Sequence, residues 1–126
     1  MESFKSCFIN FSNHPSLDWK KEQVLAAKEY GEIIDMPFPA VPADASEEDI
    51  AVLADRYAKE ITGKNPAAVM CQGEFTFVYA LVRRLNALGI VCVAACSERR
   101  TTEYTDENGN LKRESVFEFV RFREYN

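Results

Sequence analysis

The chain has 126 residues, of which 47% are hydrophobic and 28% charged, a composition typical of one soluble globular domain. Its formal net charge of -5 argues against a long nucleic-acid partner, because binding to a polyanion relies on dense lysine and arginine surfaces. No apolar run approaches the roughly 20 residues that a membrane-spanning helix needs. The first residues also lack the pattern of a secretion signal. We therefore expect a cytoplasmic protein without a membrane partner.

The cysteine and histidine content argues against a metal site. The chain has one histidine, and its cysteines form no CxxC pair. Three of the four cysteines lie inside apolar runs, where a free thiol behaves as a small hydrophobic group; the four are Cys7, Cys71, Cys92 and Cys96. We expect buried free thiols, with neither a metal nor a cofactor.

The first half of the chain predicts two strands around a helix. Residues 4–11 are rich in aromatic and apolar side chains and predict a strand. Residues 17–30 predict a helix that ends at Gly31. Residues 32–38 predict a second strand, and Pro37 places it at a sheet edge because proline cannot donate to a neighbouring strand.

The central segment predicts two helices and two buried strands. Residues 46–49 form a capping-box pattern, and apolar residues recur at helical spacing from Ile50 to Ile61. Residues 67–71 and 90–96 are short, continuously apolar runs on either side of a third helix, expected at residues 76–88. Such runs are typical of parallel strands that are covered on both faces.

The last segment predicts a β-hairpin. Residues 100–105 and 111–125 flank an Asn-Gly turn within residues 106–110, and Asn-Gly is a strong hairpin signal. We therefore predict an α/β fold, a Rossmann-like three-layer sandwich with a mainly parallel sheet and a C-terminal β-hairpin. The whole chain, residues 1–126, would be one domain, with a core at 1–99 and the appended hairpin at 100–126.

Polar groups follow the predicted third strand directly, at the turn into the next helix. Parallel strands deliver such groups to one edge of the sheet, where ligands bind in open α/β folds. The amides of a glycine turn and the start of a helix suit a phosphate. Thr76 would add a hydroxyl, and Glu74 would accept from ribose hydroxyls or an adenine amino group. The alternative is an ordinary connection capped by Thr76; the candidates are Gln72, Gly73, Glu74, Phe75 and Thr76.

Two further segments are expected at the same edge of the sheet. After the first strand, Ser12 and Asn13 stand beside the single histidine, His14, which suits binding or acid–base work. After the fourth strand come Ser97, Arg99 and Arg100, and arginine matches phosphate geometry. The alternatives are a surface histidine and a solvated, charged strand end. The ligand hypothesis requires Asn13, Gly73 and Arg99 to meet around one cavity.

The sequence resembles a known family at this point. The order strand, polar-Gly turn, apolar helix, strand is similar to the ligand-binding half of CARF domains, which are Rossmann-like. The opening FINFSNHPSLDW resembles small CRISPR-associated proteins of the ring-nuclease type. The lysine of the usual CARF glycine turn is replaced here by Glu74-Phe75-Thr76.

The resemblance implies a homodimer that binds cyclic oligoadenylate, a second messenger of type III CRISPR defence, in a cleft between its subunits. It further implies metal-free cleavage, in which a ribose 2′-hydroxyl attacks the adjacent phosphate. Arg99 or Arg100 would face the phosphorane and His14 would protonate the leaving oxygen. Ser12, Asn13 and Glu74 would fix the riboses. Whether the ligand is turned over or only bound stays open.

Two other functions stay open from the sequence alone. The first is a non-catalytic interaction module that uses the hairpin and the Phe117, Phe119 and Tyr125 face to join a partner or a second copy. The second is a small hydrolase or transferase that acts on free nucleotides or related phosphates.

Overall fold

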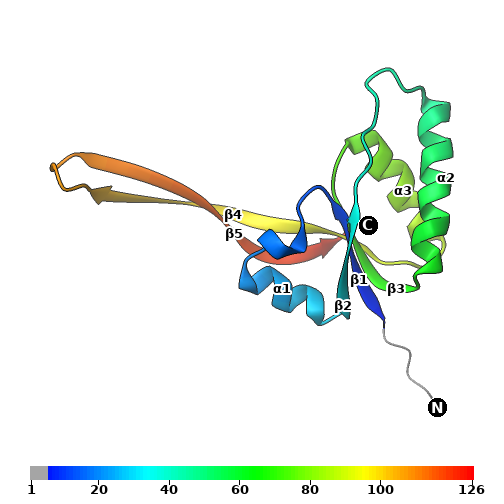
Figure 1. The fold of residues 1–126 in the computed structure, drawn as a ribbon, viewed down its shortest axis with the longest axis horizontal. Helices are drawn as coiled ribbons and strands as arrows, with labels where there is room; N and C mark the ends of the chain where they lie inside the picture. The colour runs from blue at the N-terminus through cyan, green and yellow to red at the C-terminus, as the bar shows by residue number, and fades with distance from the viewer. Residues whose placement is uncertain (1–5) are drawn as a thin grey trace, which may run out of the picture.

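The protein is described by a computed structural model for residues 6–126, and its architecture is a five-stranded sheet with helices on both faces (Figure 1). The strand order is β2-β1-β3-β4-β5; the first four strands are parallel and β5 is antiparallel to β4. The predicted α/β fold with a C-terminal hairpin is confirmed. Residues 4 and 5 of the first predicted strand lie outside the described residues. The elements are β1 (Cys7–Ser12), a 3-10 turn η1 (Ser16–Asp18), α1 (Lys21–Lys28), β2 (Glu32–Pro37), α2 (Glu47–Gly63), β3 (Pro66–Cys71), α3 (Phe75–Ala87), β4 (Cys92–Thr105) and β5 (Leu111–Glu124).

Two apolar clusters, one on each face of the sheet, hold the layers together. Alternate residues of β1 point to opposite faces, so Ile9 and Phe11 join the cluster under α2 and α3, whereas Phe8 joins the cluster beside α1. Figure 1 shows α2 and α3 on one side of the sheet and α1 on the other. Among the described residues α1 is the one α-helix on its face of the sheet, and a crevice is left open there beside β4 and β5.

The capping box that begins α2 is confirmed. The Ser46 hydroxyl accepts a hydrogen bond from the Asp49 amide at 3.1 Å, and the Asp49 carboxylate accepts one from the Ser46 amide at 3.0 Å. Each partner satisfies an amide that has no acceptor inside the helix. The edge position predicted for β2 is also confirmed.

The first helix is shorter than predicted, because the chain is extended at Trp19 and Lys20. The Ser16 hydroxyl donates a hydrogen bond of 3.1 Å to the carboxylate of Asp35 in β2. This bond fixes the 3-10 turn η1, so η1 and α1 do not join into one continuous helix. Trp19 then packs edge-on against Phe8, with ring centroids 6.4 Å apart. The break places Lys20 at the open end of the sheet rather than on a helix face.

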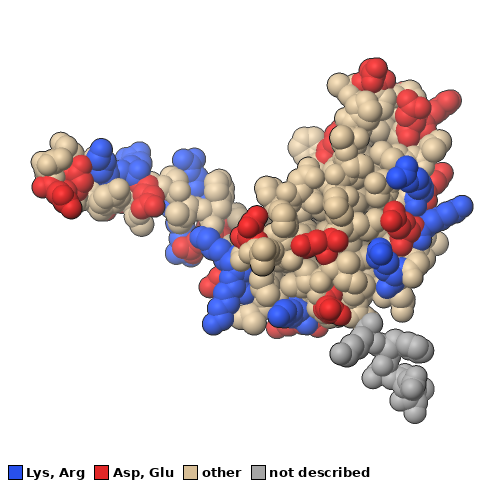
Figure 2. Space-filling view, in the orientation of Figure 1, with Lys and Arg blue, Asp and Glu red and all other residues tan. Residues whose placement is uncertain are grey.

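Residues 97–100, predicted as a polar segment after the end of the fourth strand, also differ from the prediction. Residues 97–100 lie inside β4, which runs unbroken into the hairpin and pairs with β5 as far as Thr105. The predicted turn is confirmed, with Gly109 at φ 77° and the Asp106 carboxylate accepting from the Asn108 and Asn110 amides at 2.9 Å. The distal part of this hairpin, which we call the arm (residues 97–118), projects from the body, and charges of both signs lie along it (Figure 2).

The Phe38 ring packs so closely against Gly73 that no larger residue fits at this position unless the ring moves. A β-carbon added there would lie 2.3 Å from the Phe38 ring, which is buried against Phe11 and Phe77. We expect Gly73→Ala to lower the free energy of unfolding by about 1–3 kcal/mol, the usual cost of overpacking a core. Urea unfolding of the wild type, this variant and Gly63→Ala measures it, since an added β-carbon at Gly63 meets nothing within 4 Å. Equal stability of Gly73→Ala and the wild type would disprove this explanation.

Candidate functional site

A crevice of about 430 Å³ opens at the carboxyl ends of β1 and β3. These two strands are neighbours, yet the chain proceeds from them toward opposite edges of the sheet. Ligands of open α/β sheets bind outside the strand ends at such a switch point. One wall is the segment after β1 and the other is the base of the arm. The lining residues are His14, Asp18, Trp19, Lys20, Gln23, Met70, Gln72, Ala95, Ser97, Phe117 and Phe119.

The crevice forms because β3 and β4 diverge after two paired positions. They pair only at Val69 with Cys92 and at Met70 with Val93. Beyond that point Gln72 spans the gap: its amide donates to the Phe11 carbonyl at 3.2 Å, and its side-chain oxygen accepts from the Ala95 amide. Gln72 therefore forms the base of the crevice and keeps the two diverging strands in place.

The segment after β1 is fixed by a buried amide. Asn10 is 1% exposed, and its Nδ2 donates to the His14 carbonyl at 2.8 Å and to Asp35 at 2.9 Å. The Ser12 hydroxyl donates to Asn10 Oδ1 at 2.7 Å and accepts from the His14 amide at 3.2 Å. These bonds hold the His14 backbone, so its ring stands at the crevice. Ser12 is buried inside this network, and Asn13 is exposed and does not line the crevice.

The start of α3 is already occupied by a carboxylate. Glu74 Oε1 accepts from the Thr76 hydroxyl at 2.6 Å and from the Phe77 amide at 2.8 Å. The hydroxyl, followed by the amide, lowers the pKa of Glu74 from its usual range. A fixed negative charge thus stands where a phosphate was expected, and like charges repel. This turn therefore gives no support to an anion site.

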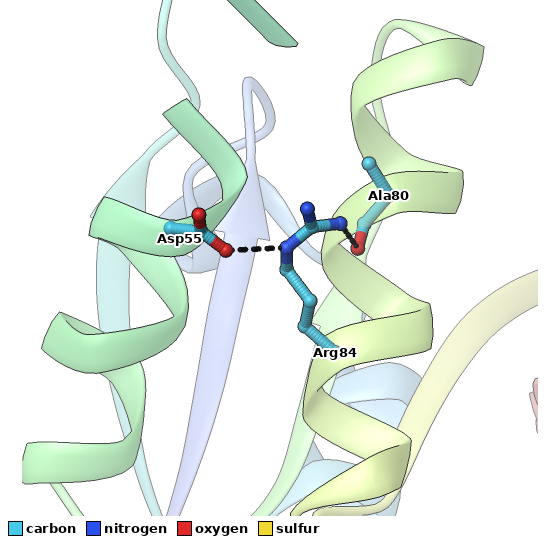
Figure 3. A network of polar contacts seen from close by, with 3 residues as sticks. All are labelled: Asp55, Ala80 and Arg84. Atoms are coloured by element: carbon cyan, nitrogen blue, oxygen red, sulfur yellow. Dashed lines mark hydrogen bonds and ion pairs between the residues drawn. The ribbon is translucent and has the colours of Figure 1, made fainter. Parts of the chain in front are cut away.

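Glu74 and Thr76 line a second cavity, of about 490 Å³, between α3 and the segment before α2. Arg84 also lines it, but its guanidinium is bound to Asp55 of α2 at 2.7 Å and to the Ala80 carbonyl at 2.9 Å (Figure 3). Arg84 therefore joins two helices. Phe75, 88% exposed, lines neither cavity.

Side chains of β4 alternate across the arm, which separates the three residues predicted there. Ser97 lines the crevice. Arg99 follows on the same face and donates to the Ser115 hydroxyl at 3.3 Å. Arg100 points to the other face, where it pairs with Glu118 at 2.7 Å and Glu98 at 3.3 Å. Asn13, Gly73 and Arg99 therefore do not meet around one cavity; His14, Gln72 and Ser97 do.

The crevice combines polar and charged groups with aromatic surface. Lys20 supplies a positive charge and Asp18 a negative one, and the His14 imidazole adds two ring nitrogens. Trp19 and the Phe117 and Phe119 rings supply the apolar walls. Cations attract phosphates, and flat aromatic rings stack with bases, so this combination suits a nucleotide.

The sequence alone missed several of these residues. Lys20 was expected inside a helix, and the aromatic pair of β5 was expected at an interface. Asn10 and Asp35 were not identified, although an asparagine within the apolar run FINF was an available signal. A polar residue inside a buried strand must find hydrogen-bond partners, and those partners are often near a site.

Three partly or fully buried groups outside the crevice, Cys71, Cys92 and Tyr125, have raised pKa values. Burial raises the pKa of Cys92 to about 12 and that of Cys71 further, so neither thiol is a ready nucleophile. Burial also raises the pKa of Tyr125 to about 12, and its hydroxyl donates to the Cys71 carbonyl at 2.7 Å. Within residues 6–126, no three acidic, cysteine or histidine side chains are grouped to hold a metal. No helix in that range is long and apolar enough to cross a membrane.

Comparison with known proteins gives a family. No curated protein and no solved structure matches the chain significantly. One family model, described as the Uncharacterized protein MJ1673 family, matches residues 6–123. That match covers the sheet, the three helices and nearly all of both hairpin strands. The chain therefore belongs to the MJ1673 family.

Proposed function

We propose that the crevice binds a nucleotide, and that its ligand is a cyclic oligoadenylate held between two copies of the chain. The observation that supports this most is the meeting of Lys20, His14 and an aromatic wall at the switch point of the sheet. The resemblance of the opening segment to small CRISPR-associated proteins favours cyclic oligoadenylate among nucleotides. The free thiols fit the reducing cytoplasm in which such a messenger acts.

Each lining group has a role in this proposal. Lys20 and His14 contact phosphate oxygens, and adenine stacks on Trp19 or Phe117. Gln23 and Ser97 offer hydrogen bonds to ribose or to the edge of the base. A volume of about 430 Å³ lies in the lower part of the range for small-molecule pockets, which suits one nucleotide unit. A ring of several units therefore needs two crevices, which a symmetric dimer provides.

The same groups support metal-free cleavage of the ring. A ribose 2′-hydroxyl gives its proton to water as its oxygen attacks the adjacent phosphorus, and the bond from phosphorus to the next 5′-oxygen breaks. The products are a 2′,3′-cyclic phosphate and a 5′-hydroxyl, whose proton comes from His14, and His14 then regains a proton from water. The Lys20 ammonium group stabilises the charge of the phosphorane, and binding aligns the attacking oxygen.

Calorimetric titration tests the proposal. We expect cyclic tetra- or hexa-adenylate to bind with a micromolar or lower Kd in the presence of EDTA, and AMP to bind at least about tenfold more weakly. Chromatography of the incubated ring then separates binding from turnover. AMP binding without ring binding favours an enzyme of free nucleotides, and no binding of either ligand disproves the proposal.

A further inference from the structure

The outer edge of β5 is the longest unpaired edge of the sheet. Within the described residues β5 pairs only with β4, so the backbone groups on its other side have no strand partner over 14 residues. Exposed apolar side chains lie along the same strand, with Leu111 70% and Phe117 66% exposed. A long, apolar, open edge is a template for pairing, and a two-stranded ribbon alone is only marginally stable.

We propose that this edge pairs antiparallel with β5 of a second copy of the chain, with Ser115 on the two-fold axis. This pairing extends the proposed function, because it identifies the outer edge of β5 as the surface through which the two copies join. The pairing itself does not depend on the ligand, whereas its consequence for the crevice rests on the proposed function.

The side chains of the strand support this register. Residues equally far from Ser115 on either side face one another in such a pair. Leu111 then meets Phe119, Lys112 meets Glu118, and Arg113 meets Phe117. Apolar, oppositely charged and cation–aromatic pairs each stabilise neighbouring strands. The symmetry repeats each of these contacts twice.

Neighbouring registers are less favourable. An axis at Val116 would place Glu114 against Glu118, and an axis at Glu114 would place that residue against itself. Like charges directly opposite one another destabilise a strand pair. The register about Ser115 avoids both contacts.

The hairpin turn adds independent charge complementarity. In the Ser115 register Glu107 of the hairpin turn falls opposite Arg123 of the second copy's β5, with Arg121 two residues further along that strand. Neither arginine has an ion pair within the described residues of its own chain, and Glu107 has none either. Figure 2 shows acidic side chains at the tip of the arm.

The pairing has a consequence for the crevice. The two-fold axis of such a strand pair is perpendicular to the sheet, so both copies present the α1 side of the sheet in the same direction. The two crevices then open on one surface, on either side of the axis. Phe117 lines the crevice, so Arg113 of the second copy, which pairs with Glu103 of its own chain at 2.9 Å, comes to its rim. The dimer thereby adds polar groups of the second copy to the site.

Cysteine cross-linking tests the register without any ligand. In the proposed pair, Ser115→Cys faces its own symmetry mate at a separation that a disulfide spans. Thr101→Cys is the matched control, because Thr101 pairs with Ser115 inside the hairpin, with hydroxyls 3.1 Å apart, but lies on β4. Under mild oxidation we expect the Ser115→Cys dimer to form at least about ten times faster than the Thr101→Cys dimer. Equal rates, or a faster Thr101→Cys dimer, overturn the proposal.

Charge reversal tests the contact at the turn. Glu107→Arg or Arg123→Glu alone should weaken the dimer, measured by sedimentation, about five- to tenfold, because like charges then meet twice. The double variant should restore it, because opposite charges meet again. A wild type that stays monomeric at high concentration, or a double variant weaker than both single variants, overturns the proposal. A dimer that binds no nucleotide removes only the proposed function, and a nucleotide-binding dimer in which Ser115→Cys does not cross-link faster than Thr101→Cys removes only this inference.

Discussion

Replacing Asn10 with alanine (Asn10→Ala) is expected to lower the free energy of unfolding by about 2–4 kcal/mol. The side chain is buried and makes three hydrogen bonds, to Ser12, His14 and Asp35. Its loss leaves the buried Ser12 hydroxyl and the His14 carbonyl without these partners, and it leaves a cavity in a packed strand. Urea denaturation of the wild type and the variant measures the difference.

The matched control for Asn10→Ala is Asn13→Ala in the following segment. The Asn13 side chain is exposed and has no hydrogen bond within the described chain, so its loss should change stability by less than about 0.5 kcal/mol. Asn10→Ala should also weaken nucleotide binding under conditions where the variant is folded, because the His14 backbone loses its anchor. Two variants of equal stability would mean that the network does not hold the segment.

Reversing the charge of Lys20 (Lys20→Glu) should weaken nucleotide binding by about 100-fold or more without unfolding the protein. In the proposed complex the ammonium group contacts a phosphate, and a carboxylate there replaces attraction by repulsion inside a partly enclosed site. Lys20 precedes the first residue of α1, where its side chain makes no capping bond. Titration calorimetry at fixed salt measures the affinity.

Lys21→Glu is the matched control, because it makes the same change in net charge one residue away. Lys21 begins α1 and does not line the crevice, and an acidic residue at a helix start is favourable. We expect at most about a threefold loss of affinity from this general change in charge. An equal loss in both variants would show that Lys20 acts only through the overall field of the protein.

Most of the fold was predictable because its signals are local. The capping box at Ser46 and the Asn-Gly turn each depend on a few adjacent residues, and both formed as expected. The two elements that differed depend on distant partners. Asp35 of β2 holds Ser16 in a turn and so shortens α1. Pairing with β5 keeps residues 97–100 in β4, although their polar sequence resembles a strand end.

The site was predictable only in part. The alternation of strands and helices predicted polar residues from separate loops at one edge of the sheet, and His14, Gln72 and Ser97 do line one crevice. The sequence could not distinguish a glycine that meets a phosphate from one that meets an aromatic ring, and Gly73 meets Phe38. Nor could it show that Glu74 caps its own helix, because that depends on the backbone path at a single turn.

The central claim is that the crevice at the switch point of the sheet is the ligand site. A nitrogen-15 NMR titration with cyclic tetra-adenylate tests this claim most directly. We expect shifts of the amide signals that concentrate at His14, Lys20, Gln72, Ser97 and Phe117, while signals from the exposed face of α2 stay in place. Shifts confined to the second cavity, between α3 and the segment before α2, or no shift at saturating ligand, would contradict this claim.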